Sequence, residues 1–149
     1  MRAVAQRVRS ARIQVENECV GEMGEGLLAL VGVGTDDGPK QAEELARKLV
    51  QIRVFADDEG RMNRSLLDTG GALGVVSQFT LFGDARRGRR PSYTEAAPPE
   101  QAEPLIQALV AAARAAGVHV VTGRFRAMMA VELVNAGPVT ILLDTAKRF

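Results

Sequence analysis

The chain of 149 residues contains no tryptophan and only one cysteine, Cys19, and one histidine, His119. A single cysteine cannot close an internal disulfide, and Cys19 is interpreted as a structural residue. Catalytic zinc takes at least three histidine, cysteine or carboxylate ligands, so we expect no metal. A Ser-His-Asp triad could use only His119 as its base. Because His119 lies in the alternating segment 118–121, we interpret it as a half-exposed strand residue instead.

Long apolar runs are also missing. None reaches the roughly 18 to 20 residues that span a bilayer, and the N-terminal nine residues lack an apolar signal segment. We therefore expect a cytoplasmic location and no membrane partner. The net charge of +1 creates no overall field that would mark a nucleic-acid binder. The length and the balance of 46% apolar to 25% charged residues favour one globular domain over residues 1–149.

The periodicity of apolar residues predicts an α/β fold, with two helices packed on a mixed, mostly antiparallel sheet. A helix is expected from Pro39, where Ala42, Leu45, Ala46 and Leu49 repeat at helical spacing, and a second over 100–116, stopped by Gly117. Segment 62–68 is ambiguous, and Gly70 and Gly71 interrupt it. Strands are expected at 2–15, 19–23, 27–33, 54–55, 72–81, 118–122, 129–134 and 139–144.

Two glycine patterns suggest nucleotide binding but lack its context. Segment 24–29 fits the loose dinucleotide fingerprint, yet a β-like run follows it where that fingerprint needs the start of a helix. Segment 32–35 lacks the lysine and the spacing of a phosphate-binding loop. We expect no cofactor.

Four arginines, Arg86, Arg87, Arg89 and Arg90, fall within five positions beside Gly88 and Pro91. Guanidinium groups suit phosphate oxygens, and a loop can place several of them along an RNA backbone. A solvated surface loop explains the same pattern. The cluster therefore permits contact with RNA without establishing it.

Two short segments stand out as candidate sites. Ser77-Gln78-Phe79-Thr80-Leu81 ends the predicted central strand. Ser77 and Thr80 are three apart and would point to opposite faces of a regular strand, so both serve one site only if the strand bends or ends there. Otherwise they are two hydroxyls that bond locally. Asn135-Ala136-Gly137-Pro138-Val139-Thr140 is interpreted as a turn between the last two strands.

What remains is a site with little acid–base machinery. Such a site needs an already reactive bond, a positioned water or hydroxyl, and backbone amides that hold an oxyanion. An aminoacyl ester on a ribose is such a substrate, and it carries its own neighbouring 2′-hydroxyl.

Both short segments resemble, in order and spacing, the two signature motifs of the D-aminoacyl-tRNA deacylase family. The resemblance extends over nearly the whole chain. It includes segments 1–4, 6–8, 62–63, 65–68, 90–92, 96–100 and 122–125. Together these matches are specific, although each alone is weak.

The resemblance implies a homodimer whose active sites combine both subunits and act on aminoacylated tRNA, not DNA. Ser77, Gln78, Phe79 and Thr80 would line the pocket for the terminal adenosine and its aminoacyl group. The Gly137-Pro138 peptide is expected to be cis and to reach into the partner's pocket. Further residues expected to bind substrate or select its chirality are Asn135, Met129 and Arg7.

Chirality would then be selected by steric rejection. Backbone packed on one side of Cα leaves no room for an L side chain, whereas a D side chain points away. Glycyl-tRNA, which has no side chain to reject, should also be accepted to some extent.

Two mechanisms stay open. Thr80 would act as the nucleophile, or the RNA 2′-hydroxyl or a held water would attack, with amides near Phe79 and Thr80 stabilising the oxyanion. The chain also departs from the family pattern: Arg126 replaces a usual glycine, Met128 a usual polar residue and Ala136 a usual acidic one. Other hypotheses are a hydrolase of another activated acyl ester and a non-catalytic RNA-binding dimer. The second is disfavoured by the small number of aromatic residues.

Overall fold

The computed structural model describes residues 1–149, and its centre is a sheet in the order β2-β1-β3-β6-β7, with β8 paired to β1 as well. The strands are β1 (Arg2–Val15), β2 (Glu18–Met23), β3 (Gly26–Gly32), β6 (Ala72–Ser77), β7 (Val120–Thr122) and β8 (Met129–Asp144). The pairs β3–β6 and β6–β7 are parallel, and those of β1 with β2, β3 and β8 are antiparallel. The predicted α/β class and mixed sheet are confirmed.

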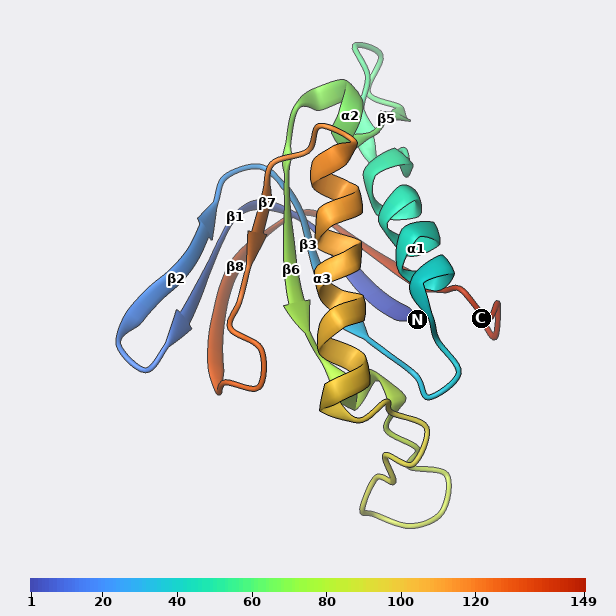
Figure 1. The fold of residues 1–149 in the computed structure, drawn as a ribbon. Helices are drawn as coiled ribbons and strands as arrows, with labels where there is room; N and C mark the ends of the chain where they lie inside the picture. The colour runs from blue at the N-terminus through green and yellow to red at the C-terminus, as the bar shows by residue number, and fades with distance from the viewer.

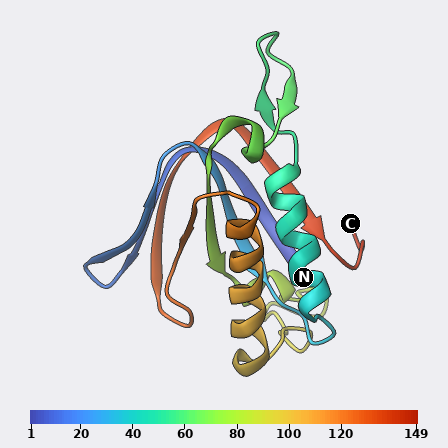
Figure 2. The same ribbon diagram turned by 45° about the horizontal axis from the view of Figure 1, so that its top comes forward.

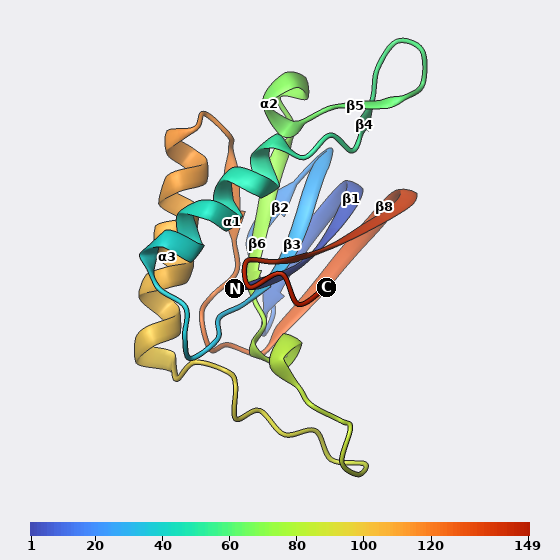
Figure 3. The ribbon, with the colours of Figure 1, turned by 90° about the vertical axis from the view of Figure 1, so that its right-hand side faces the viewer.

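Two long helices, α1 (Pro39–Gln51) and α3 (Pro99–Ala115), cover one face of the sheet (Figures 1 and 3). They form where the periodicity predicts them, because proline begins each helix and small or aliphatic residues recur on one side. Leu45 and Leu49 of α1 and Leu109 of α3 are fully buried against Leu27 and Leu73 of the sheet. This core fixes the position of α3 over β6 and β7. No helix combines the length and apolarity that crossing a bilayer requires.

A third helix, α2 (Leu66–Thr69), corrects the prediction of two. It is one turn long and occupies the segment that the sequence left ambiguous, after β5 (Met62–Arg64). Ser65 caps it by accepting from Asp68 N–H, Asp68 accepts from Ser65 N–H in return, and Gly70 ends it with φ of 70°. The strand predicted at 54–55 is β4 (Phe55–Ala56), which pairs with β5 as a hairpin that projects beyond the sheet (Figure 1).

Two predicted strands are shorter than expected. β6 ends at Ser77 rather than at residue 81, because the chain then folds into a 3-10 helix, η1 (Phe79–Phe82). Phe82 turns inward and is buried, with Arg2 stacked over its ring at 4.4 Å. β7 begins at Val120 rather than 118. His119 therefore precedes that strand and is exposed rather than half-exposed.

The last strand, β8, corrects the predicted turn at Gly137-Pro138. Residues on both sides of this dipeptide pair with the same strand in the same sense: Thr140 opposite Gln6, and Asn135 opposite Val8. Between these pairs, residues 136–139 stand opposite the single residue Arg7. The chain thus bulges without reversing its direction. β1 and β8 arch over together as a consequence (Figure 2).

Candidate active site

Ser77 stands at the point where β6 gives way to η1. Gln78 N–H continues the parallel pairing by donating to Val31 O at 2.7 Å, and the first 3-10 bond runs from Leu81 N–H to Gln78 O at 3.3 Å. The strand therefore ends between Ser77 and Thr80, which is the condition under which both residues can serve one site. The N–H groups of Phe79 and Thr80 precede the first 3-10 bond.

A cavity of about 410 Å³ opens beside Ser77, between α3 and strands β6 and β7. Met129 at the start of β8 also lines it, so the structure brings together two of the residues singled out in the sequence. Gly123 admits the Met129 side chain, because a Cβ at Gly123 would lie only 2.4 Å from its sulfur. The remaining lining residues are Val75, Glu103, Ile106, Gln107, Val110, Ala111, Arg114, Thr122, Gly123, Arg124 and Phe125.

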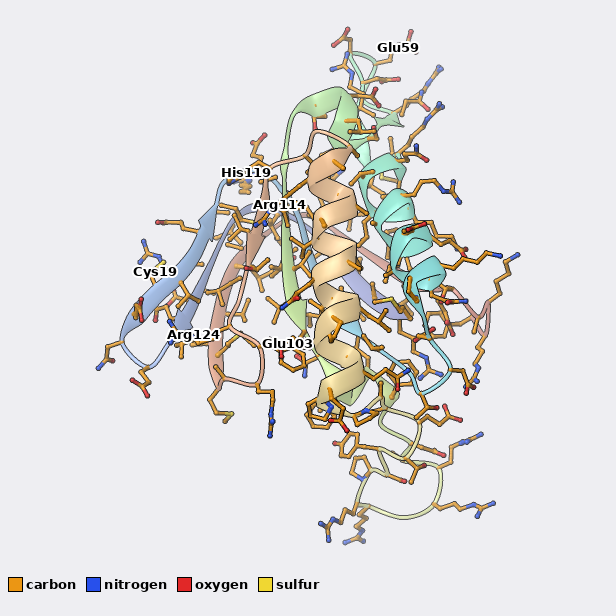
Figure 4. The ribbon with its side chains drawn as sticks, viewed as in Figure 1. Cys19, Glu59, Glu103, Arg114, His119 and Arg124 are labelled. Atoms are coloured by element: carbon orange, nitrogen blue, oxygen red, sulfur yellow. The ribbon has the colours of Figure 1, made fainter.

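The outer wall of the cavity was not predicted. Glu103 and Arg114 lie on the side of α3 nearest β7, and Arg124 lies on the connection from β7 to β8 (Figure 4). Arg114 Nη2 donates to Val120 O at 3.2 Å, and Arg124 pairs with Glu18 of β2 at 3.1 Å. The exposed polar positions of α3 at three- and four-residue spacing were a usable signal, but only the tertiary fold shows which strands they face.

Gln78 precedes η1, which begins with Phe79 and Thr80, and none of these three residues lines the cavity itself. Gln78 Nε2 donates to Thr80 Oγ1 at 2.5 Å, and this is the only side-chain hydrogen bond that the hydroxyl makes. An amide donor cannot remove a proton from the hydroxyl, so the structure gives Thr80 no general base.

The Gly137-Pro138 bond is cis, and both residues are exposed, as is Asn135. Arg7 supports this bulge: its Nε donates to Ala136 O at 2.9 Å and its Nη1 to Val54 O at 2.5 Å. A Cβ at Gly137 would lie 2.8 Å from Arg7 Nη2. Neither Arg7 nor the bulge lines the cavity of the same chain. The predicted site residues therefore fall into two separate groups within the chain.

The arginine cluster lies in an exposed loop between η1 and α3, closed at its base by paired main-chain bonds between Asp84 and Ser92. Arg86 Nη2 pairs with Asp84 at 2.7 Å. The hydrogen bond from Arg86 lowers the pKa of Asp84 to about 2 and raises that of Arg86. Arg87, Arg89 and Arg90 form no ion pair.

Cys19 and His119 stay outside both groups. Cys19 is exposed on β2, where its thiol lies 3.5 Å from Gly21 O. His119 contributes its main-chain oxygen to Leu73 N–H at 2.9 Å. Neither contacts Ser77 or Thr80 in a way that would form a catalytic pair.

A family model described as D-Tyr-tRNA(Tyr) deacylase matches residues 4–144. The chain is 59% identical to the D-aminoacyl-tRNA deacylase of Roseiflexus sp. (strain RS-1), over 98% of this chain and 94% of the relative. It is 56% identical to the protein of that name from Symbiobacterium thermophilum, over 100% of this chain and 99% of the relative. The solved structure of a c-Myc DNA unwinding element binding protein superposes with a TM-score of 0.91 at 35% identity, covering 97% and 99% of the two chains. The chain therefore belongs to the D-Tyr-tRNA(Tyr) deacylase family, whose relatives carry the name of an ester-cleaving enzyme.

Proposed function

We propose that this protein is a cytoplasmic D-aminoacyl-tRNA deacylase, which hydrolyses the ester between a D-amino acid and the terminal ribose of tRNA. The family membership supports this reaction class. The observation that carries the proposal is the cavity at the end of β6, which Ser77, Met129 and Phe125 all line. Its volume of about 410 Å³ suits a nucleoside with an attached aminoacyl group. Polar Ser77 and Thr122 would orient the ribose, and the apolar wall would take the base.

The catalytic step would use the substrate's own 2′-hydroxyl or a held water. The aminoacyl ester is already activated, so the protein needs to position it and to stabilise the oxyanion. The N–H groups of Phe79 and Thr80, which precede the bonds of η1, would supply that stabilisation. The side-chain amide of Gln78 donates a hydrogen bond to the Thr80 hydroxyl and so cannot act as its base. This contact supports the substrate-assisted route over a threonine nucleophile.

The second group of residues would act in a homodimer. The Gly137-Pro138 bulge is exposed and lies outside its own cavity, so it is available to the cavity of a second copy. Val134 and Leu142 of β8 are 52% and 58% exposed and would supply apolar contact between the copies. The partner's Gly137 and Pro138 would present main-chain oxygens to the substrate Cα. An L side chain would collide with them, whereas a D side chain or the hydrogen of glycyl-tRNA would not.

The arginine loop would hold the RNA. Arg87, Arg89 and Arg90 are exposed and unpaired, so their guanidinium groups are available to phosphate oxygens. The loop follows η1 directly, so it would lie on the side from which the tRNA approaches the proposed oxyanion-binding amides.

The test is hydrolysis of matched D-tyrosyl-tRNA and L-tyrosyl-tRNA by the purified, chelator-treated protein. Release of the D amino acid with the L ester intact is the expected result. Equal hydrolysis of both would replace the proposal with a general esterase. Sedimentation at micromolar concentration tests whether the chain forms a dimer. A monomer would contradict the proposed site, which combines the cavity of one copy with the bulge of another.

A second candidate function is nucleic-acid binding without catalysis. The 35% identical structure carries the name of a DNA-binding protein, and three arginines are free here. Tight binding of uncharged tRNA with both esters left intact would favour this alternative.

A further inference from the structure

Phe79 and Tyr93 form an aromatic pair on the surface. Their ring centroids are 5.2 Å apart and their planes are inclined by 67°, the edge-to-face arrangement that aromatic rings prefer. Phe79 is 55% exposed and Tyr93 is 39% exposed, so the pair packs on itself rather than into the core. The chain has only six aromatic residues, five Phe and one Tyr, yet two of them are held together in solvent.

The loop around Tyr93 is well anchored. Asp84 and Ser92 exchange main-chain hydrogen bonds of 2.8 and 2.9 Å immediately before it, and Ala96 N–H donates to Tyr93 O at 3.0 Å. Gly83 lets the ring approach the backbone, because a Cβ at Gly83 would lie 3.0 Å from Tyr93 Cε1. The aromatic pair is therefore a preformed surface.

The surroundings of the pair carry positive charge. Arg87, Arg89 and Arg90 lie in the loop that Asp84 and Ser92 close, and none of them is neutralised by an ion pair. Exposed aromatic faces beside cationic side chains are the combination that binds single-stranded nucleic acid. Phe79 also lies only two residues from Ser77 at the cavity, so the aromatic pair is within reach of an RNA strand whose end occupies the cavity.

We propose that the Phe79–Tyr93 pair is a stacking platform for the unpaired nucleotides that precede the terminal adenosine of the substrate RNA. This inference rests on the proposed function and deepens it. The cavity holds the terminal nucleoside, the aromatic pair stacks the base before it, and the three arginines contact the connecting phosphates. Stacking of this kind changes affinity by about five- to 150-fold per base.

The protein carries its own probe for this contact. Tyr93 is the only tyrosine and there is no tryptophan, so the fluorescence of the native protein reports on this residue alone. We expect a short RNA with an unpaired CCA end to quench that emission after correction for its absorbance. A blunt RNA hairpin of equal charge should quench it much less. Equal quenching by the two RNAs, or no quenching by either, would contradict the stacking platform.

Kinetics provide the second test, with D-tyrosyl-tRNA and the D-tyrosyl ester of adenosine as paired substrates. Tyr93→Ala should lower kcat/KM for the tRNA ester at least fivefold through KM, and should change that of the nucleoside ester less than twofold. Tyr93→Phe, which keeps the ring, should behave as the wild type. A loss that is equal for the two substrates would contradict the platform.

These outcomes separate the two proposals. If wild-type protein hydrolyses neither ester while quenching persists, the proposed function fails and the platform stands as an RNA-binding surface. If both esters are hydrolysed and Tyr93→Ala has no substrate-dependent effect, the platform alone fails. A change in the sedimentation of the Tyr93→Ala variant would also contradict the stacking platform. Such a change would mean that the Phe79–Tyr93 pair is covered by a second copy of the chain rather than free to bind RNA.

Discussion

Arg7 donates through Nε to the main-chain oxygen of Ala136 at 2.9 Å, across the paired strands β1 and β8. The same guanidinium reaches Val54 O, so one side chain bridges the bulge of β8 and the base of the β4–β5 hairpin. Ala136 is the residue before Gly137. Arg7 therefore holds the main chain immediately before the exposed Gly137-Pro138 peptide.

Replacement of Arg7 by lysine should therefore weaken chiral selection. Lysine keeps the charge but cannot reach both carbonyls with a fixed fork, so the bulge loses its support. We expect the ratio of D to L hydrolysis of tyrosyl-tRNA to fall at least tenfold. We also expect the free energy of unfolding to drop by about 1.5–3 kcal/mol, because a charged hydrogen bond is lost. Arg9→Lys, at an exposed position of the same strand, is the control. An unchanged D-to-L ratio would remove Arg7 from the selection mechanism.

Thr80→Ala distinguishes the two mechanisms. If the RNA 2′-hydroxyl or a water attacks, the variant should retain kcat within about tenfold, because main-chain amides remain in place. If Thr80 is the nucleophile, kcat should fall by several orders of magnitude. Single-turnover hydrolysis of D-tyrosyl-tRNA measures the chemical step directly. Gln78→Glu serves as the companion variant, since it replaces the donor to Thr80 by an acceptor.

Asp84→Asn should strengthen RNA binding. At present Asp84 neutralises Arg86, and its pKa of about 2 keeps it ionised at every physiological pH. The amide keeps the hydrogen-bond acceptor but frees the Arg86 charge. The slope of log Kd against log salt concentration should therefore steepen by roughly 0.7 for one added phosphate contact. Arg89→Ala should make it shallower by a similar amount, and Arg61→Ala, on the distant β5 side, should leave it unchanged.

Arg126→Gly should stabilise the protein. Arg126 has φ of 62°, a left-handed conformation that costs a side-chain-bearing residue roughly 1–2 kcal/mol. Glycine removes that cost but loses more entropy on folding, so we expect a net gain of about 0.5–1 kcal/mol in denaturant unfolding. Ala127→Gly, at a neighbouring residue with negative φ, should lose stability instead. If both variants lose stability, the strain at Arg126 is relieved in some other way.

Asp68 should contribute to acid unfolding. Hydrogen bonds from the Ser65 main chain and hydroxyl lower the pKa of its carboxyl below the usual 3.8. Because the folded pKa is the lower one, its contribution is complete above pH 3.8 and is lost as pH falls towards the folded value. Asp68→Asn should flatten the dependence of unfolding free energy on pH below 4. Urea titrations at pH 3 and pH 6 measure it, and an unaltered pH dependence would contradict the cap.

The regular helices and strands could be predicted because the spacing of their apolar residues is a local property of the sequence. The alternation of residues 2–15 and the helical spacing after Pro39 describe single elements, and the structure has both. The one-turn helix α2 had a usable signal in the Ser65 and Asp68 capping pair followed by Gly70. Its four residues are too few for a periodic pattern to emerge.

The Gly137-Pro138 segment shows where local chemistry misleads. A glycine followed by proline is typical of a turn, yet residues on both sides of it pair with β1 in one direction. The decisive group is Arg7, which lies 129 residues from the carbonyl that it holds. The α3 wall of the cavity could not be predicted for the same reason. Gln107 and Arg114 line the cavity only because the fold places β6 and β7 beneath them.

The central strand β1 has a consequence for how the protein is made. It pairs with β3 at its beginning and with β2 at its end, both of which follow it closely in sequence. The other edge of β1 pairs with β8 alone, and the partners Gln6 and Thr140 are 134 positions apart in the sequence. Contacts between residues so far apart in the sequence form slowly, and an unpaired strand edge can pair with other chains. Until residues 129–144 have been synthesised, β1 therefore has no partner along the edge that β8 covers in the folded protein.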